Sequence, residues 1–175
     1  MRQEKQVSCL EADRPFPAAV RLGEDAEVVQ IRLFRPGDGS AVADLVQRCL
    51  REVNSRDYPA QIIERMCRHF SEERIAQLAD ERQMFVAEQA GIMGTVSRDG
   101  NRVFTMFVHP EVIGQGVGRR LMRHIELLAA AEGCDYMETG ASITGHGFYR
   151  RLGYVDVRTS ETEFGLNYIL RKPLP

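Results

Sequence analysis

The chain has 175 residues, of which 43% are hydrophobic and 27% are charged, and its formal net charge at pH 7 is −2. These values are ordinary for one globular domain that is long enough to bury a hydrophobic core. The charge balance argues against nucleic acid and anionic membranes as partners, because both attract basic proteins. No apolar run approaches the roughly 18 residues of a membrane span, and the N-terminus lacks a hydrophobic signal core, so we expect a cytoplasmic protein.

The cysteines and histidines give no metal-binding pattern. The four cysteines are far apart, and no two of them form a Cys-x-x-Cys pair. Cys49, Cys67 and Cys134 fall on apolar faces of predicted elements, where a thiol behaves as a small hydrophobic group. His124 and His146 have no partner at metal-ligand spacing. We therefore expect reduced structural thiols and no metal.

Residues 1–27 show no hydrophobic period and contain a proline-bearing stretch, which predicts a flexible N-terminal extension to a domain at residues 28–175. The pattern that follows predicts a strand, three helices and a hairpin. In chain order, these are a strand at 28–34, a helix with an apolar stripe over 42–53, a helix opened by Pro59, a short helix at 72–78, and hairpin strands at 84–88 and 92–97.

The second half alternates strands and helices. An apolar run at 103–108, followed by Pro110, predicts a buried central strand, and a helical pattern begins at Val117. The strands on either side of this helix must pair in parallel, because the helix is their crossover connection. The remaining elements are predicted as a strand at 134–139, a short helix at 146–152, and strands at 154–157 and 164–170.

Three alternating glycines, Gly114, Gly116 and Gly118, lie between the central strand and its helix. Glycine allows the backbone to take φ > 0 and to approach a ligand closely. The N–H groups of the first helical turn then favour an anion, above all a phosphate. Arg119 and Arg120 add positive charge beside them. The segment therefore predicts a binding loop for a phosphorylated cofactor.

Two known kinds of phosphate loop match this segment poorly. A Walker A loop is excluded because no lysine follows the glycines. A dinucleotide-binding fingerprint needs Gly-x-Gly-x-x-Gly directly after the strand and an acid about 20 residues on. Asp135 and Glu138 could supply the acid, but the glycines run Gly-x-Gly-x-Gly and five residues separate the strand from the loop.

Residues 108–122, which read VHPEVIGQGVGRRLM, resemble motif A of the GNAT N-acetyltransferases, in which a Gln/Arg-x-x-Gly-x-Gly/Ala pattern follows a strand ending in Val-x-Pro. Gly116 and Gly118 occupy the two glycine positions, whereas Ile113 stands where the family has Gln or Arg. Residues 148–154, FYRRLGY, resemble the Phe-Tyr-x-x-x-Gly-Phe/Tyr signature of the same family.

The resemblance covers roughly residues 28–172 and implies a GNAT-like α/β fold. This fold has a twisted, mixed, mainly antiparallel sheet of six to seven strands, with helices on both faces. The resemblance also implies an acyltransferase that moves an acetyl group from acetyl-CoA, its cosubstrate, directly to an amine in a ternary complex. The central strand would diverge from the next strand and pair with pantetheine, with the N–H of Val108 near the thioester oxygen. The implied cofactor-binding residues are Met106, Phe107, Val108, Ile113, Gly114, Gln115, Gly116, Val117, Gly118, Arg119 and Arg120.

The resemblance assigns catalysis to Tyr149, which would protonate the departing CoA thiolate. An ammonium acceptor must also lose a proton to a base before it attacks. The start of the central strand, where many GNAT enzymes have a glutamate, carries no carboxylate here. Glu138, His109 and an ordered water remain open as alternatives.

The resemblance implies that the acceptor is a small-molecule amine or a protein amine. It also implies an acceptor pocket shaped by the first two helices and their link, here about residues 54–63, where Asp57 and Tyr58 could touch the acceptor. A homodimer is compatible with the sequence. Two other functions stay open. Ile113 and the missing carboxylate favour a non-catalytic acyl-CoA-binding regulatory protein, which Tyr149 argues against. The glycines and Glu138 favour a dinucleotide-binding module.

Overall fold

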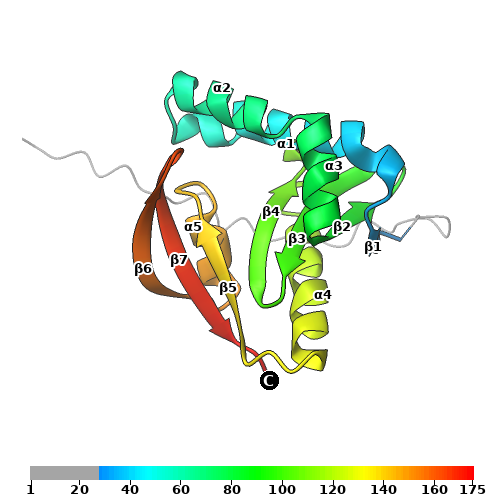
Figure 1. The fold of residues 1–175 in the computed structure, drawn as a ribbon, viewed down its shortest axis with the longest axis vertical. Helices are drawn as coiled ribbons and strands as arrows, with labels where there is room; N and C mark the ends of the chain where they lie inside the picture. Colours follow the sequence, from blue (N-terminus) through cyan, green and yellow to red (C-terminus); the bar gives the residue numbers. More distant parts are fainter. Residues whose placement is uncertain (1–27) are drawn as a thin grey trace, which may run out of the picture.

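The computed structural model describes residues 28–175; the expected extension at 1–27, with Cys9, lies outside the described residues. Figure 1 shows a twisted sheet with helices packed on it. The elements are β1 (Gln30–Leu33), α1 (Gly39–Glu52), α2 (Ala60–His69), α3 (Glu72–Glu81), β2 (Gln83–Glu88), β3 (Ile92–Asp99), β4 (Arg102–Val108), α4 (Val117–Ala131), β5 (Tyr136–Ala141), α5 (His146–Arg151), β6 (Val155–Thr162) and β7 (Gly165–Pro173). Short 3-10 turns lie at 36–38, 54–56 and 110–112. None of the helices in this described part is long and apolar enough to cross a membrane.

The strands form one seven-stranded sheet in the order β1-β2-β3-β4-β5-β7-β6. Every neighbouring pair is antiparallel except β4 and β5, which are parallel. The parallel pair flanks α4, as predicted from the crossover. The mixed, mainly antiparallel sheet expected from the sequence is therefore confirmed. Residues 28–175 do not form the doubly wound parallel sheet that a dinucleotide-binding module would need.

The sheet is open between β4 and β5. The two strands pair only where Arg102 faces Glu138 and Val103 faces Thr139, and they diverge beyond that point (Figure 1). The sequence predicted a buried strand over 103–108. This prediction is wrong for its second part, because Val103 is buried but residues 104–108 are only half-buried. Within the described part of the chain, no strand pairs with the β5-side edge of these residues, and they line a cavity instead.

A β-bulge lies in the part of β4 that pairs with β3 but not with β5. Thr105 has a φ of 45°, and the register between β3 and β4 shifts between Thr95 and Ser97. A bulge inserts one extra residue into a strand and bends it, which changes the direction of the following backbone groups. The bulge therefore changes the direction of the backbone groups in the part of β4 that borders the cavity.

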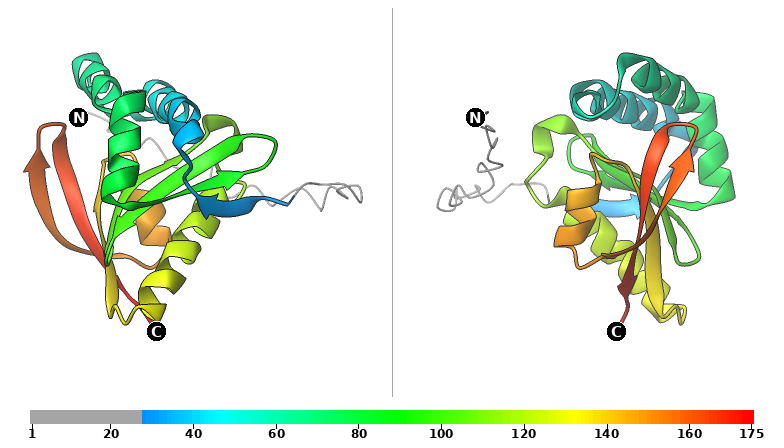
Figure 2. Two further views of the ribbon diagram at one scale, coloured as in Figure 1. Left: turned by 45° about the vertical axis from the view of Figure 1, so that its right-hand side comes forward. Right: turned by 90° about the vertical axis from the view of Figure 1, so that its left-hand side faces the viewer.

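Helices cover both faces of the sheet (Figure 2). The apolar stripe of α1 packs with α2, α3 and alternate residues of β2, among them Met84 and Val86. Phe85 and Ala87, which point the other way, belong to the core beneath α4 and α5. Side chains that alternate between the two faces in this way are expected for a strand such as β2 that is buried on both faces of the sheet. The predicted arrangement of helices on both faces is therefore correct.

Some element boundaries differ from the predictions. Helix α3 continues past residue 78 to Glu81, and the hydroxyl of Ser71 caps its start by accepting from the N–H of Arg74. Strand β5 begins at Tyr136, because the N–H of Cys134 still bonds to the carbonyl of Ala129 in the turn that ends α4. Strand β6 continues to residue 162 through backbone pairing with β7, although its polar residues show no alternation.

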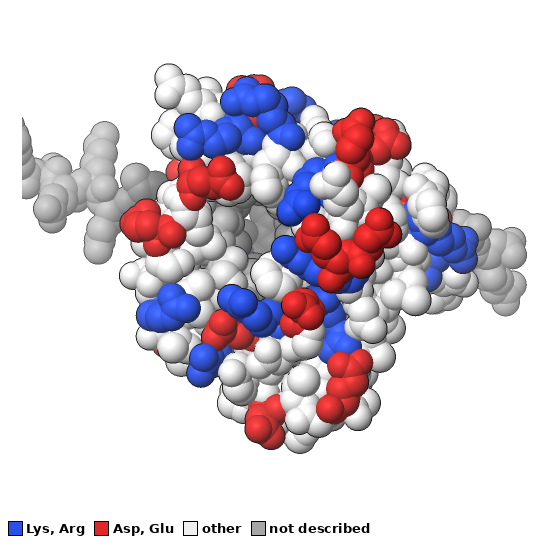
Figure 3. All heavy atoms as spheres, viewed as in Figure 1, with Lys and Arg blue, Asp and Glu red and all other residues white. Residues whose placement is uncertain are grey.

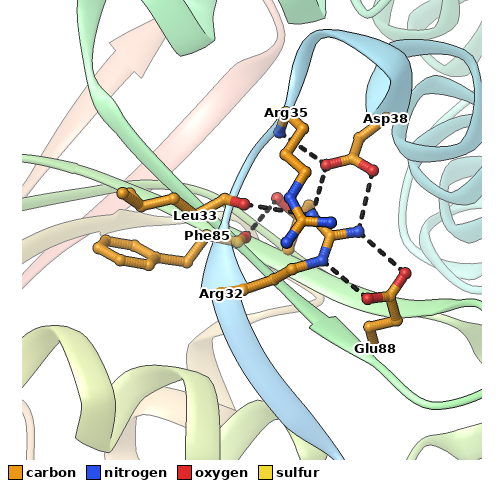
Figure 4. Close-up of polar contacts among 7 residues, drawn as sticks. Arg32, Leu33, Arg35, Asp38, Phe85 and Glu88 are labelled. Carbon is orange, nitrogen blue, oxygen red and sulfur yellow. Dashed lines mark hydrogen bonds and ion pairs between the residues drawn. The ribbon is translucent and has the colours of Figure 1, made fainter.

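An ion cluster ties the first strand to the rest of the domain (Figure 4). Arg32 donates to Glu88 at 2.7 and 2.9 Å and to Asp38 at 2.7 and 3.0 Å. Asp38 also accepts from the backbone N–H of Arg35 at 2.7 Å. The side chains of Arg32 and Asp38 are 15% and 12% exposed. Hydrogen bonding to Arg32 lowers the pKa of Asp38 and that of Glu88 below their ordinary values.

The substitution Arg32→Met should lower the free energy of unfolding by about 2 to 3 kcal/mol at pH 7, because it leaves the Asp38 carboxylate largely buried without its cation. The control Arg158→Met, at an exposed position on β6, should change it by no more than about 0.5 kcal/mol. Urea unfolding measures both.

Because of the same ion cluster, the difference in free energy of unfolding between Arg32→Met and Arg158→Met should depend on pH. Because the folded pKa values of Asp38 and Glu88 are depressed, the stabilisation is present above the ordinary carboxyl pKa of about 4 and is lost as pH falls through the folded values. The free energies of unfolding of the two variants should therefore approach each other as the pH falls below about 4. Equal losses in Arg32→Met and Arg158→Met at pH 7 would show that the cluster does not stabilise the fold.

Candidate active site

A cavity of about 840 Å³ opens where β4 and β5 diverge. It is lined by α1, α2 and their link, by β4 and the loop after it, by the start of α4, by β5 and α5, and by the tip of the β6–β7 hairpin. Figure 3 shows the hollow on the face of the molecule seen in Figure 1, with acidic and basic side chains interspersed around it.

The glycine loop forms one end of the cavity. Gly114 and Gly116 have φ angles of 87° and 85°, and Gly116 is the residue that precedes α4. A Cβ at Gly116 would meet no atom within 4 Å, so the space beside this residue is open. Gly118 is required for another reason. A Cβ there would lie 3.0 Å from Met106 and 3.1 Å from Phe148, so this glycine lets α4 pack closely against β4 and α5.

Backbone donors without an acceptor in the helix lie at this end of the cavity. The N–H of Arg120 bonds to the carbonyl of Gly116 at 3.0 Å, which begins the hydrogen-bond ladder of α4. The N–H groups of Val117, Gly118 and Arg119 therefore have no acceptor within the helix, and all three residues line the cavity. Together with the positive end of the helix dipole, these groups favour a phosphate.

Most of the predicted cofactor-binding residues meet at the cavity. Those that line it are Met106, Phe107, Val108, Ile113, Gly114, Gly116, Val117, Gly118 and Arg119. Gln115 and Arg120 lie beside the loop but do not line it. The amide of Gln115 donates to the carbonyl of Glu111 at 3.2 Å, and Arg120 is exposed on α4.

Cys49 contacts the free edge of β4 from α1. Its thiol donates to the carbonyl of Val108 at 2.8 Å. Burial raises the pKa of this thiol to about 12, so it remains protonated and keeps that hydrogen bond. The predicted structural role of Cys49 fits this environment, although the residue also lines the cavity. A buried, protonated thiol is a poor nucleophile.

Tyr149 reaches the cavity from α5 and is only 6% exposed. The rings of Phe148 and Tyr154 pack edge-on against it, with centroids 5.2 and 5.6 Å away. Burial raises the pKa of Tyr149 to about 12, against the opposing effect of a hydrogen bond with Thr139. The hydroxyl is therefore protonated at neutral pH and can donate a proton.

The two side chains considered as a base are held away from the cavity. Glu138 accepts from Arg171 at 2.7 Å and pairs with Arg102 at 3.8 Å, and it is not part of the lining. His109, also outside the lining, has its Nε2 2.9 Å from Arg48. The lining instead contains His69, the last residue of α2, and Glu163, at the tip of the β6–β7 hairpin.

The predicted acceptor residues Asp57 and Tyr58 fix the loop that follows β5. Tyr58 lines the cavity, and its hydroxyl accepts from the N–H of Ile143 at 2.9 Å. Asp57 lies outside the lining and accepts from the hydroxyl of Thr144 at 2.7 Å. The link between α1 and α2 therefore contributes to the cavity wall, as predicted, mainly through Tyr58 and its neighbour Asn54.

Sequence reasoning did not single out Arg151. This residue of α5 lines the cavity and, with Arg119, also borders an adjoining cavity of about 470 Å³ that Arg123 lines as well. Its place two residues after the tyrosine of the second motif was visible in the sequence. Its proximity to the start of α4 was not, because that depends on how the two helices pack.

Comparison with known proteins agrees with the geometry. The family model described as an acetyltransferase (GNAT) domain matches residues 80–156. An acetyltransferase of Pectobacterium atrosepticum is 34% identical over 113 residues, which are 61% of this chain and 71% of that protein. The peptidyl-lysine N-acetyltransferase YjaB of Salmonella typhimurium is 28% identical over 106 residues, 59% of this chain and 68% of that protein.

Solved structures share the fold. A GCN5-related N-acetyltransferase from Rhodopseudomonas palustris has a TM-score of 0.79 at 22% identity, covering 85% of this chain and 98% of that one. The PaiA N-acetyltransferase of Thermoplasma acidophilum, crystallised with coenzyme A, has a TM-score of 0.68 at 16% identity, covering 83% of this chain and 99% of that one. Given the 34% identity to a curated acetyltransferase, the motif-bearing segment matched by the family model and the shared fold, the chain belongs to the GNAT family of N-acetyltransferases.

Proposed function

We propose that this acetyltransferase moves an acetyl group from acetyl-CoA directly to an amine, with both substrates bound in the cavity at once. One observation carries the proposal. A single cavity connects the donor-rich start of α4, the free edge of β4, the buried Tyr149 and a separate end formed by α1, α2 and the β6–β7 hairpin. Two substrates can therefore approach Tyr149 from different ends.

The residues at the first end fit acetyl-CoA, which supplies the acetyl group and the leaving thiolate when bound. The N–H groups of Val117, Gly118 and Arg119 match a pyrophosphate, and the open space beside Gly116 leaves room for it. Arg119 and Arg151 add positive charge. The unpaired edge of β4 at residues 104–108 offers backbone partners for the amides of pantetheine.

The chemistry in the middle of the cavity belongs to Tyr149 and the edge of β4. An N–H of this edge, for which Val108 is our choice, stabilises the thioester oxygen as it gains negative charge. The protonated hydroxyl of Tyr149 delivers a proton to the departing thiolate. His69 and Glu163, in the lining near the other end, can take the proton that the acceptor ammonium loses, directly or through water.

Direct transfer is favoured over a covalent acetyl-enzyme. Cys49 is the cysteine that lines the cavity, and its pKa of about 12 leaves almost no thiolate at neutral pH. Its proton is also engaged with the carbonyl of Val108. The side chain is therefore better suited to supporting the edge of β4 than to attacking a thioester.

A substitution at Gly116, compared with one at a glycine outside the cavity, should distinguish an effect on CoA binding from an effect on folding. Gly116→Val places a side chain at a residue whose φ is +85°, and this side chain fills the open space beside the start of α4. The affinity for CoA should therefore fall by at least about 30-fold, equivalent to about 2 kcal/mol. The matched control is Gly100→Val, in the β3–β4 turn, where φ is +53° and a Cβ also meets nothing within 4 Å.

Isothermal titration with CoA tests both glycine variants, and thermal unfolding reports the backbone strain that they share. Gly100→Val should bind CoA like the wild type. If Gly116→Val bound CoA as tightly as Gly100→Val, the loop would not be the phosphate site.

The substitution Tyr149→Phe keeps the ring and removes the proton donor, so kcat should fall by about 10²- to 10⁴-fold while the Kd for CoA stays nearly constant. The control Tyr154→Phe removes a hydroxyl that bonds to Glu126 outside the cavity, and kcat should hardly change. Steady-state acetylation and CoA titration measure the two effects.

The pH profile gives a further test of Tyr149. A proton donor with a pKa of about 12 is lost only as pH rises through that value, so the rate should show no alkaline fall between pH 7 and about pH 10. A fall in that window, or an unchanged kcat in Tyr149→Phe, would remove Tyr149 from the proposed role.

A further inference from the structure

The end of the cavity away from the glycine loop has an aromatic wall. From the hairpin towards β4, ring centroids lie 5.4 Å apart for Phe164 and His69, 4.9 Å for His69 and Phe70, and 5.6 Å for Phe70 and Phe107. All four residues line the cavity. Edge-to-face contacts of this kind hold rings in fixed positions, so the wall is a preformed surface for an apolar or aromatic group.

Aliphatic side chains from α1 and α2 complete this region. Leu50 and Met66 are almost fully buried and line the cavity beside Cys49 and Tyr58. We call this end the acceptor compartment; it comprises Cys49, Leu50, Tyr58, Met66, His69, Phe70, Phe107 and Phe164. With acetyl-CoA at the end near α4, as proposed above, the amine would reach Tyr149 through the acceptor compartment.

The acceptor compartment is bridged on its outer side. Arg65 of α2 donates to the carbonyl of Glu163 at 3.0 Å, which joins α2 to the tip of the β6–β7 hairpin. Figure 1 shows the hairpin reaching α2 across the opening of the sheet. Tyr58 is likewise joined to the loop after β5 through Ile143. A polypeptide on both sides of a target lysine would have to displace one of these bridges, whereas a small molecule would not.

The charges in the lining limit the acceptor further. Glu163 is the only carboxylate among the lining residues, and the lining arginines Arg119 and Arg151 belong to α4 and α5, at the cofactor end. Glu163 lies at the hairpin tip, at the acceptor end, where it can pair with the ammonium of the reacting amine. A second ammonium group, as in a polyamine or an amino sugar, would then have no carboxylate of its own among the lining residues. A carboxylate, as in an amino acid, would lack a cation there. Both losses are costly in a desolvated site.

Building on the proposed function, we infer that the acceptor is a small primary amine with an aromatic body and no second charge, that is, an arylalkylamine. Its ring lies against Phe70 and Phe164, and its amino group reaches the thioester beside Tyr149. A C–N bond forms as the C–S bond breaks. The amine loses a proton and the thiolate gains one, so the products are an N-acetylated arylalkylamine and CoA.

Matched pairs of amines test the inference, with acetyl-CoA as donor and free thiol as the readout. Phenylethylamine and phenylalanine share ring and amine but differ by a carboxylate; pentylamine and 1,5-diaminopentane differ by one ammonium. We expect phenylethylamine to have the highest kcat/KM, and each extra charge to lower kcat/KM by at least about 10-fold, equivalent to about 1.4 kcal/mol. A lysine-containing peptide should be a poor acceptor.

Variants connect the preference to the acceptor compartment. Phe164→Leu and Phe70→Leu should each raise the KM for phenylethylamine about 10-fold and leave the Kd for CoA unchanged, because neither residue belongs to the cofactor end. Tyr136→Leu is the control, since Tyr136 is a half-buried aromatic residue of β5 outside the lining. Thermal unfolding verifies that all three variants fold.

The outcomes separate this inference from the proposed function. Transfer to the peptide or to diaminopentane in preference to phenylethylamine would overturn the inference and leave the acetyltransferase intact. Equal KM values for phenylethylamine in the Phe164 and Tyr136 variants would also overturn it. Failure to bind CoA, or CoA binding with no transfer to any amine, would overturn the proposed function together with the inference.

Discussion

The site depends on the divergence of β4 from β5 after two residue pairs. If these strands stayed paired, the backbone groups of residues 104–108 would be used within the sheet and no cavity would exist. The opening is held by packing on both sides of β4. The thiol of Cys49 bonds to Val108 from α1, and Gly118 brings α4 against Met106 and Phe148 from the other face. Interactions that stabilise the fold therefore also keep the edge of β4 free for binding.

Burial gives two ionisable groups in the cavity different chemical uses. Both Tyr149 and Cys49 have pKa values of about 12, because each side chain is desolvated. For Tyr149 this means that a proton is available to a leaving thiolate at neutral pH. For Cys49 it means that the nucleophilic thiolate is suppressed. The same physical effect thus keeps the Tyr149 hydroxyl protonated well above neutral pH and disfavours a covalent intermediate on Cys49.

Local features of the site could be predicted from the sequence, whereas its long-range features could not. The spacing of the glycines predicted the loop before α4, and Gly116 has the positive φ that this prediction requires. The bulge at Thr105 depends on pairing with β3, so no local pattern revealed it. Arg65 and Glu163, which close the acceptor compartment, are 98 residues apart. Glu138 was considered as a base from its strand position, but its pairing with Arg171 depends on β7.

The central claim is that both substrates occupy one cavity and that the acetyl group passes directly between them. Initial rates measured while acetyl-CoA and the amine are varied together test this claim most directly, alongside incubation of the protein with labelled acetyl-CoA alone. A ternary complex predicts reciprocal plots that intersect and no label retained on the protein. Parallel plots with acetyl label on Cys49 would contradict the account.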